Sequence, residues 1–395
     1  MFSKGLIYKG FISLFILGLL FPNTGLFRGK ENAKIVAREN RKITAFPQDS
    51  VKKKSFYVSF EKWYQDRLRY RDKAILAWKK LNYNCGVILS DSIFLGKDNW
   101  LFNRGNTIGG FKNKEAKAQA LKRIQDYCQK HNAKFVFLLA PTKESIYTDY
   151  FPLKEQRKYK PYAYWEQQVI ASLHVKGVSN LSVTKRLLGD KLAVKEPVYF
   201  KDDHHWSYYG AAAASELLLK KFNQMSGHTV FSDLVFNATK EGVFKEYSYA
   251  NTLGFGQTYK TNAPWNSHFT EEIYTKDCYS GKEDKLKILP SNNVLWGRIV
   301  NGEGIVINKA IKNGSTLLVL GDSYSSYMVP YLSQRFSKVV STHYRDSHGK
   351  KKEVNMKRLI ETYKPDYVLL EMLGNAFFAS NDKDKIGKIT LPKDF

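Results

Sequence analysis

Cysteine is scarce in this chain of 395 residues, which contains only Cys85, Cys128 and Cys278. Three scattered cysteines exclude a disulfide framework and a CxxC zinc site. Acidic residues are also few, because 37 Asp and Glu stand against 63 Lys and Arg, for a formal net charge of +26. The composition further excludes collagen, a coiled coil and a membrane protein with many spans.

The residues that are present indicate a globular protein with a strongly basic surface. Hydrophobic residues make up 43% of the chain and aromatic residues 14%, enough to bury a large core. The length predicts two or three units, or one large domain with an extra arm. The basic residues are spread along the chain, and the densest clusters are Lys52–Lys54 and Lys350–Lys352. The positive charge fits a polyanion, an anionic membrane surface or an acidic polysaccharide. A dispersed excess is more typical of a solvated surface than of a nucleic-acid footprint, so we expect no nucleic acid partner.

The first 27 residues differ from the rest. Lys4 and Lys9 precede an apolar run, and no further charge occurs until Arg28. This pattern is typical of a signal anchor or a signal peptide, and we favour an uncleaved anchor over a removed signal and over a buried helix. The flanking lysines predict that the remainder lies outside the cytoplasm. Residues 28–95 then read as a stalk with an N-terminal helical segment.

An alternation of helices and strands follows. Continuous apolar strands separated by helices predict an α/β fold with a parallel sheet covered on both faces. Residues 225–314 interrupt the alternation and are predicted to be a long insertion. We therefore expect residues 96–395 to form one domain that includes this insertion. The expected strands are 135–140, 316–320, 339–342 and 367–371, and the expected helices are 114–130, 161–173, 207–222, 325–336 and 353–363.

The sequence LLVLGDSY, residues 317–324, takes a buried strand into Gly321, Asp322 and Ser323 and then into a helix. In an open parallel sheet, ligands bind beyond the carboxyl ends of the strands. A serine there has an exposed hydroxyl and a backbone N–H near a helix start, which suit a nucleophile and an oxyanion donor. The alternative is a simple helix cap.

The sequence KDDHHWSYYG, residues 201–210, contains four adjacent residues that ionise or bind metals. A serine nucleophile needs a base, and the base needs an orienting carboxylate. Alternate positions of an extended segment project the same way, so the pair is Asp203 with His205 or Asp202 with His204. A metal site and a capped helix start are the alternatives.

Three further residues are weaker candidates. His343 and His348 follow a predicted strand near Ser323 and are spare candidates for the base. Asn375 follows the strand at 367–371 and has an amide that suits an oxyanion, although it equally suits a turn.

The motif Asp203-His204-His205-Trp206, with GDSY downstream, resembles the bacterial DHHW proteins. These are similar to the SGNH-hydrolase-like O-acetyltransferases of exopolysaccharides, of which the alginate acetylation proteins are the best known. Shorter segments share the resemblance, which covers roughly residues 36–380: 39–41, 60–67, 96–102 and 141–147.

The resemblance implies an SGNH-hydrolase-like fold and a role for particular residues. The family pattern D-x-H-W falls on Asp203, His205 and Trp206, so it favours Asp203 as the orienting carboxylate and His205 as the base. Ser323 matches the nucleophile. Both partners precede the serine, as in the alginate-type relatives, which look circularly permuted. The resemblance gives His204 no defined role. Asn375, Trp206 and Asp322 are the candidates for oxyanion or substrate contacts.

The function implied is O-acetyl transfer to an extracytoplasmic polysaccharide through an acyl-serine, without metal or cofactor. A membrane-bound O-acyltransferase is the implied donor of acetyl groups. We expect the protein at the outer face of the membrane, anchored by its N-terminal segment, or periplasmic or secreted if that segment is cleaved. An acetylesterase and a non-catalytic polysaccharide-binding or assembly protein are the alternative functions.

Overall fold

The computed structural model describes residues 4–20, 44–48, 54–66, 71–87, 90–106, 113–159, 162–193, 195–245, 249, 253, 258–269, 272–276, 282–285, 303–343, 354–374, 377, 385–386 and 389–390. The chain divides into two compact units. One consists of Met1–Ser90 with Ala250–Gly256, and the other of Asp91–Tyr249 with Gln257–Phe395.

The first unit contains the helices α1 (Lys4–Leu20), α3 (Lys54–Gln65) and α4 (Arg71–Asn84). Helix α1 has 17 residues, and its apolar side chains from Phe11 to Leu17 are exposed. Among the described residues, no helix has both the length and the apolar character needed to cross a membrane. Membrane anchoring by the N-terminal segment therefore stays a prediction.

The second unit is built on an eight-stranded sheet with the strand order β4-β3-β13-β10-β11-β9-β7-β8. The first five strands run parallel to one another. Their bounds are β4 (Asn180–Ser182), β3 (Lys134–Ala140), β13 (Tyr367–Leu373), β10 (Thr316–Gly321) and β11 (Lys338–His343). This mostly parallel sheet confirms the predicted fold class.

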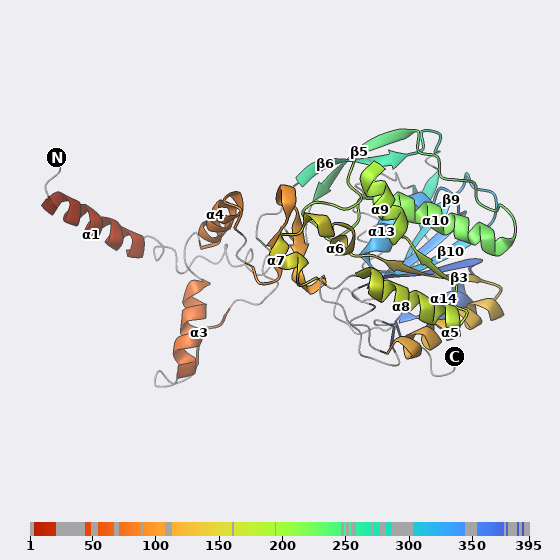
Figure 1. Cartoon of the computed structure of the whole chain (residues 1–395), viewed down its shortest axis with the longest axis horizontal. Coiled ribbons are helices and arrows are strands. Elements are labelled where there is room, and N and C mark those ends of the chain that lie inside the picture. The colour runs from red at the N-terminus through yellow and green to blue at the C-terminus, as the bar shows by residue number, and fades with distance from the viewer. Residues whose placement is uncertain are drawn as a thin grey trace. The chain divides into compact units, whose positions relative to one another are not determined.

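Helices cover both faces of the sheet, as Figure 1 shows. Helices α9 (Thr184–Ala193), α10 (Tyr208–Ser226) and α13 (Ser323–Leu332) lie on one face, and helices α5 (Lys114–Lys130), α8 (Tyr162–Val175) and α14 (Met356–Tyr363) lie on the other. The strand residues alternate between the two cores. Leu317 and Val319 pack in the core under α10 and α13, whereas Leu318 and Leu320 pack in the core under α5 and α14.

The segment expected as an insertion, 225–314, contributes to the sheet itself. Strands β7 (Ile273–Lys276), β8 (Glu283–Lys285) and β9 (Glu303–Asn308) extend it, and β9 pairs antiparallel with β11. Strands β5 (Ala238–Lys245) and β6 (Thr258–Trp265) form a separate antiparallel pair. Antiparallel strands need no crossover helix between them, so this segment lacks the alternation of helices and strands seen in the rest of the unit.

Shorter elements complete the second unit. They are β1 (Ile93–Leu95), η2 (Lys97–Asn99), β2 (Leu101–Asn103), η3 (Arg104–Asn106), α6 (Lys143–Ile146), η4 (Thr148–Tyr150), α7 (Leu153–Gln156), β12 (Val354–Asn355), β14 (Lys385–Ile386) and β15 (Ile389–Thr390). Strands β1 and β2 form a hairpin. The carboxyl end of β3 leads into α6, and that of β10 into α13, so both junctions lie at the same edge of the sheet.

Candidate active site

Ser323 is the first residue of α13, immediately after β10 and the capping residue Asp322. The carboxylate of Asp322 accepts hydrogen bonds from the backbone N–H of Tyr324 at 2.9 Å and of Leu373 at 3.0 Å. The first contact caps the helix, and the second ties the turn to the neighbouring strand β13. Ser323 is thus held half-buried at the carboxyl edge of the sheet, beside a helix start.

Asp203 and His205 lie in a tight loop that precedes α10. Tyr199 and Trp206 pair across the base of this loop, and the backbone N–H of Phe200 donates to the carbonyl of His205 at 3.1 Å. Asp203 is 2% exposed and His205 is 7% exposed. The sequence therefore folds the Asp-x-His segment as a closed, buried loop, in which the Asp203 carboxylate accepts the backbone N–H of His205 at 2.9 Å.

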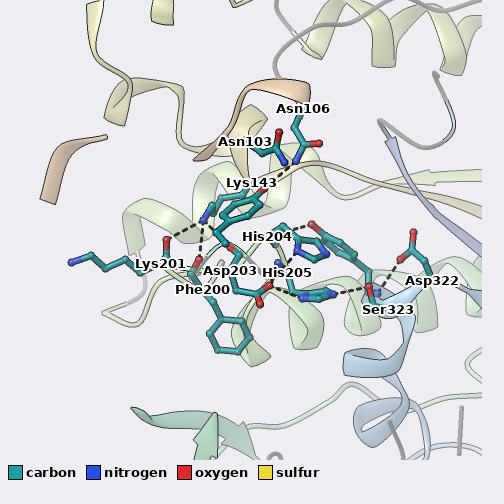
Figure 2. Close-up of polar contacts among 12 residues, drawn as sticks. Asn103, Asn106, Lys143, Phe200, Lys201, Asp203, His204, His205, Asp322 and Ser323 are labelled. Carbon is teal, nitrogen blue, oxygen red and sulfur yellow. Dashed lines mark hydrogen bonds and ion pairs between the residues drawn. The ribbon is translucent and has the colours of Figure 1, made fainter. Parts of the chain in front are cut away.

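The structure brings Asp203, His205 and Ser323 together in a chain of contacts (Figure 2). Asp203 Oδ1 lies 2.6 Å from Nδ1 of His205, and Nε2 of His205 lies 2.6 Å from Oγ of Ser323. Burial opposes ionisation of Asp203, but His205, with His204 adding to it, holds the pKa of the carboxyl well below its usual range. An ionised carboxylate only accepts, so Nδ1 carries the proton and Nε2 accepts from Ser323.

His204 lies beside this chain of contacts. Its ring is tilted by 34° over that of His205, with 3.8 Å between centroids, and its Nδ1 is 3.5 Å from Asp203 Oδ1. Burial, together with His205 and Lys143, lowers the pKa of His204 despite the opposing attraction of Asp203. His204 is therefore a neutral imidazole beside the His205 ring, with a side chain that is 29% exposed.

Trp206 and Tyr324 support the two segments from behind. Trp206 is fully buried, and its indole N–H donates to the backbone carbonyl of Tyr324 at 3.0 Å. The hydroxyl of Tyr324 donates to the backbone carbonyl of His204. These contacts correct the oxyanion or substrate role expected for Trp206, because a fully buried ring whose N–H is already donated supports the site from the core.

A buried carboxyl that sequence reasoning missed lies under the serine turn. Glu371 of β13 is fully buried, and its Oε2 accepts the backbone N–H of Asp322 at 3.1 Å. A Cβ placed on Gly321 would come within 2.8 Å of the same oxygen, so the glycine permits this approach. Burial and the charge of Asp322 raise the pKa of Glu371 well above its usual value. The sequence signal that could have revealed Glu371 is the presence of one acidic residue inside the apolar run YVLLEML, residues 367–373.

Two adjacent charged residues after β3 were also missed. Lys143 and Glu144 are fully buried. Glu144 accepts hydrogen bonds from the backbone of Asn103 at 2.9 Å, from Asn106 at 3.1 Å and from the hydroxyl of Tyr249 at 2.9 Å. The signal in the sequence was a charged pair that begins three residues after the end of an apolar strand, at the edge of the sheet where ligand sites form.

Of the remaining candidates from the sequence, Asp322 and His343 lie among the described residues. Asp322 caps α13 with its carboxylate and donates its backbone N–H to Glu371, so neither group faces an oxyanion in this geometry. His343 ends β11, where it is in register with Gly321. Asn375 and His348 lie outside the described residues.

A metal ion is the competing use of the same side chains. Ligand atoms of Asp203, His204 and His205 lie within 4.8 Å of one another, and this is the group of such residues found among those described. In this structure, Asp203 Oδ1 and both ring nitrogens of His205 already take part in the hydrogen bonds that lead to Ser323. The hydrogen bonding therefore favours a role for these atoms in general acid–base catalysis over a role as metal ligands.

Comparison with known proteins identifies similar domains and folds. Residues 93–281 match the family model of the SGNH hydrolase-like domain of the acetyltransferase AlgX. The match includes Asp203 and His205 and ends before Ser323. A search of curated protein sequences finds no significant match.

Several solved structures share the fold. A DHHW family protein from Eubacterium siraeum is 17% identical, with a TM-score of 0.55 over 78% of this chain and 98% of that one. PatB1 from Bacillus cereus is 19% identical, with a TM-score of 0.53 over 75% of this chain and 100% of that one. A second structure of PatB1 carries a sulfonyl adduct, and its TM-score is 0.52. The resemblance predicted from the sequence is thereby confirmed: residues 93–281 match the SGNH hydrolase-like domain model, and the solved structures share the fold.

Proposed function

We propose that this protein is an O-acetyltransferase that modifies the hydroxyl groups of an extracytoplasmic polysaccharide through an acyl-serine intermediate. The observation that carries the proposal is the continuous contact from Asp203 through His205 to Ser323, with two separations of 2.6 Å. The match of residues 93–281 to the AlgX acetyltransferase domain supports transfer of an acetyl group as the reaction.

In the first step, Ser323 Oγ attacks the carbonyl carbon of an activated acetyl ester or thioester, and His205 Nε2 takes the hydroxyl proton. Asp203 stabilises the imidazolium that forms. The C–O or C–S bond to the leaving group breaks, and the leaving group departs with that proton. The backbone N–H of Ser323, the first residue of α13, and the positive end of the helix dipole stabilise the oxyanion.

In the second step, His205 removes the proton of a sugar hydroxyl, whose oxygen attacks the acyl-serine carbonyl. The sugar ester forms, the bond to Ser323 breaks, and the proton returns from His205 to Ser323. The proton that departs with the leaving group in the first step is replaced by the proton of the sugar hydroxyl in the second, so Ser323 and His205 end in their starting protonation states.

The substrate and location rest on charge and on the resemblance. A net charge of +26 favours an anionic glycan or an anionic membrane surface as the partner. The basic start and apolar run of the first 27 residues support anchoring at the outer face of the membrane. The resemblance to the alginate acetylation proteins implies a membrane-bound O-acyltransferase as the acetyl donor.

Intact-mass spectrometry after exposure to p-nitrophenyl acetate tests the proposal. The parent should gain the mass of one acetyl group, and Ser323→Ala should not. Ser326→Ala is the matched control, because this hydroxyl lies one turn further along α13 and donates to the Ser323 carbonyl at 2.8 Å. Equal labelling of Ser323→Ala and the control would overturn the acyl-serine mechanism. A sulfonyl fluoride is a second probe, since PatB1 carries a sulfonyl adduct.

A product assay separates transfer from hydrolysis. The labelled protein is incubated with an acidic oligosaccharide, and acetate and acetylated sugar are measured. Acetylated sugar supports the transferase, whereas free acetate with every acceptor indicates the acetylesterase. If a chelator abolished the activity and zinc restored it, the result would instead support a metal-dependent hydrolase with Asp203, His204 and His205 as ligands.

A further inference from the structure

Lys143 is a fully buried lysine whose ammonium lies inside the loop that carries the acid and base. Its Nζ donates to the backbone carbonyls of Phe200 at 3.2 Å, Lys201 at 3.0 Å and Asp203 at 2.7 Å. An ammonium has three N–H groups, so these three carbonyls can engage all of them. Figure 2 shows Lys143 facing the loop on the side away from Ser323.

The walls of this ammonium site are aromatic. Nζ lies 4.8 Å from the ring centroid of Tyr249, 5.2 Å from that of Phe102 and 5.7 Å from that of Trp100. Ring faces attract a desolvated cation, so the three rings stabilise the ammonium through cation–π contacts. Glu144, the residue after Lys143, accepts a hydrogen bond from the hydroxyl of Tyr249. This hydrogen bond fixes the position of the Tyr249 ring beside the ammonium.

Three carbonyl oxygens that converge on one point repel one another, because each is the negative end of a dipole. The cation removes that repulsion and fixes the peptide planes of residues 200–203. Asp203 belongs to this loop, and its carboxylate must lie within hydrogen-bond distance of His205 Nδ1. The placement of the carboxylate therefore depends on the ammonium beneath its own backbone.

We propose that Lys143 is a positioning residue, which acts through Asp203 by gathering the carbonyls of the 200–203 loop around its ammonium and so orienting the carboxylate toward His205. This inference rests on the proposed function. It assigns Lys143 a part in the acylation step without contact with the substrate.

The first test compares Lys143→Met with the parent in the rate of acylation by p-nitrophenyl acetate. The variant keeps the length of the side chain but removes the cation, and acylation should slow by about 100-fold or more with little change in KM. Lys191→Met is the matched control. Lys191 donates to the carbonyl of Ile146 at 3.1 Å and lies 4.7 Å from the ring centroid of Tyr147, but its contacts are with α6 and η4. The control should acylate like the parent.

A double-mutant cycle separates positioning from general support of the fold. If Lys143 acts through Asp203, then Lys143→Met should add little to the loss already caused by Asp203→Asn. Additive losses would overturn the inference. So would a parent-like acylation rate in Lys143→Met, provided that the parent is itself acylated on Ser323. A parent that is not acylated would instead reject the proposed function.

Chemical rescue covers the case of a poorly folded variant. Lys143→Ala leaves a space that methylammonium fits, and added methylammonium should restore part of the acylation rate, whereas sodium chloride at equal ionic strength should not. Circular dichroism is recorded on the same samples. Restored folding without restored acylation, or a failure to fold under every condition, shows a purely structural role and contradicts the inference.

Discussion

The indole N–H of Trp206 donates to the backbone carbonyl of Tyr324 at 3.0 Å, and the two rings lie 5.1 Å apart. Trp206 directly follows His205, and Tyr324 directly follows Ser323. The hydroxyl of Tyr324 returns a hydrogen bond to the backbone of His204. Two segments that lie 118 positions apart are thus joined twice, on either side of the contact between the proposed base and nucleophile.

Trp206→Phe should lower both stability and acylation rate. The substitution leaves the carbonyl of Tyr324 buried without its donor, which costs about 1–3 kcal/mol in the free energy of unfolding. The shift of His205 relative to Ser323 should slow acylation by p-nitrophenyl acetate. Urea unfolding and a stopped-flow burst measure the two effects. Trp265→Phe, at a buried ring on β6, is the control and should leave the burst rate unchanged. An unchanged burst in Trp206→Phe would contradict the supporting role.

Asp203→Asn should slow acylation by roughly 10³- to 10⁴-fold while the protein stays folded, because the amide no longer stabilises the imidazolium or selects the tautomer with Nδ1–H. The decisive measurement is single-turnover acetylation of Ser323 followed by mass spectrometry. A rate close to that of the parent would show that the buried carboxylate plays no part in the reaction.

Glu371→Gln should change how stability depends on pH. Burial and the charge of Asp322 raise the pKa of Glu371 above the usual 4.5. The native protein therefore keeps a proton that the unfolded chain releases, and the contribution of Glu371 to the free energy of unfolding falls as the pH rises above 4.5. Glutamine does not titrate, so the variant should gain stability relative to the parent over this range.

Urea unfolding at a series of pH values checks this result. Glu115→Gln, at an exposed position on α5, controls for the loss of one carboxylate. A difference between Glu371→Gln and the parent that stays constant from pH 4.5 to neutral pH would show that Glu371 is ionised in the native protein.

Thiol labelling tests the core on the α5 face of the sheet. Cys128 is buried, and burial raises the pKa of its thiol to about 12, whereas Cys85 is exposed. In a Cys278→Ser background, iodoacetamide should modify Cys128 about 10³-fold more slowly than Cys85, because little thiolate forms and access is blocked. Guanidinium chloride should remove the difference. Equal labelling of the native protein would show that α5 does not pack on the sheet as described.

Much of the fold could be predicted from local patterns. The helix expected at 114–130 coincides with α5, and the apolar runs at 135–140 and 316–320 lie within β3 and β10. These patterns are readable because a strand buried on both faces is apolar throughout. The strands β7 to β9 were not predicted, since partly exposed antiparallel strands mix polar and apolar residues and resemble loops.

The sequence by itself determined the Asp-x-His spacing and the strand, glycine and capping aspartate that lead to Ser323, because spacing and capping act over a few residues. Only the tertiary structure decided that His205 meets Ser323 at 2.6 Å, and that Asp203 rather than Asp202 accepts from His205 Nδ1. It alone placed Lys143 under the loop and Glu371 under the serine turn. Such contacts join residues far apart in the chain, and they depend on the order of strands in the sheet, which no local pattern encodes.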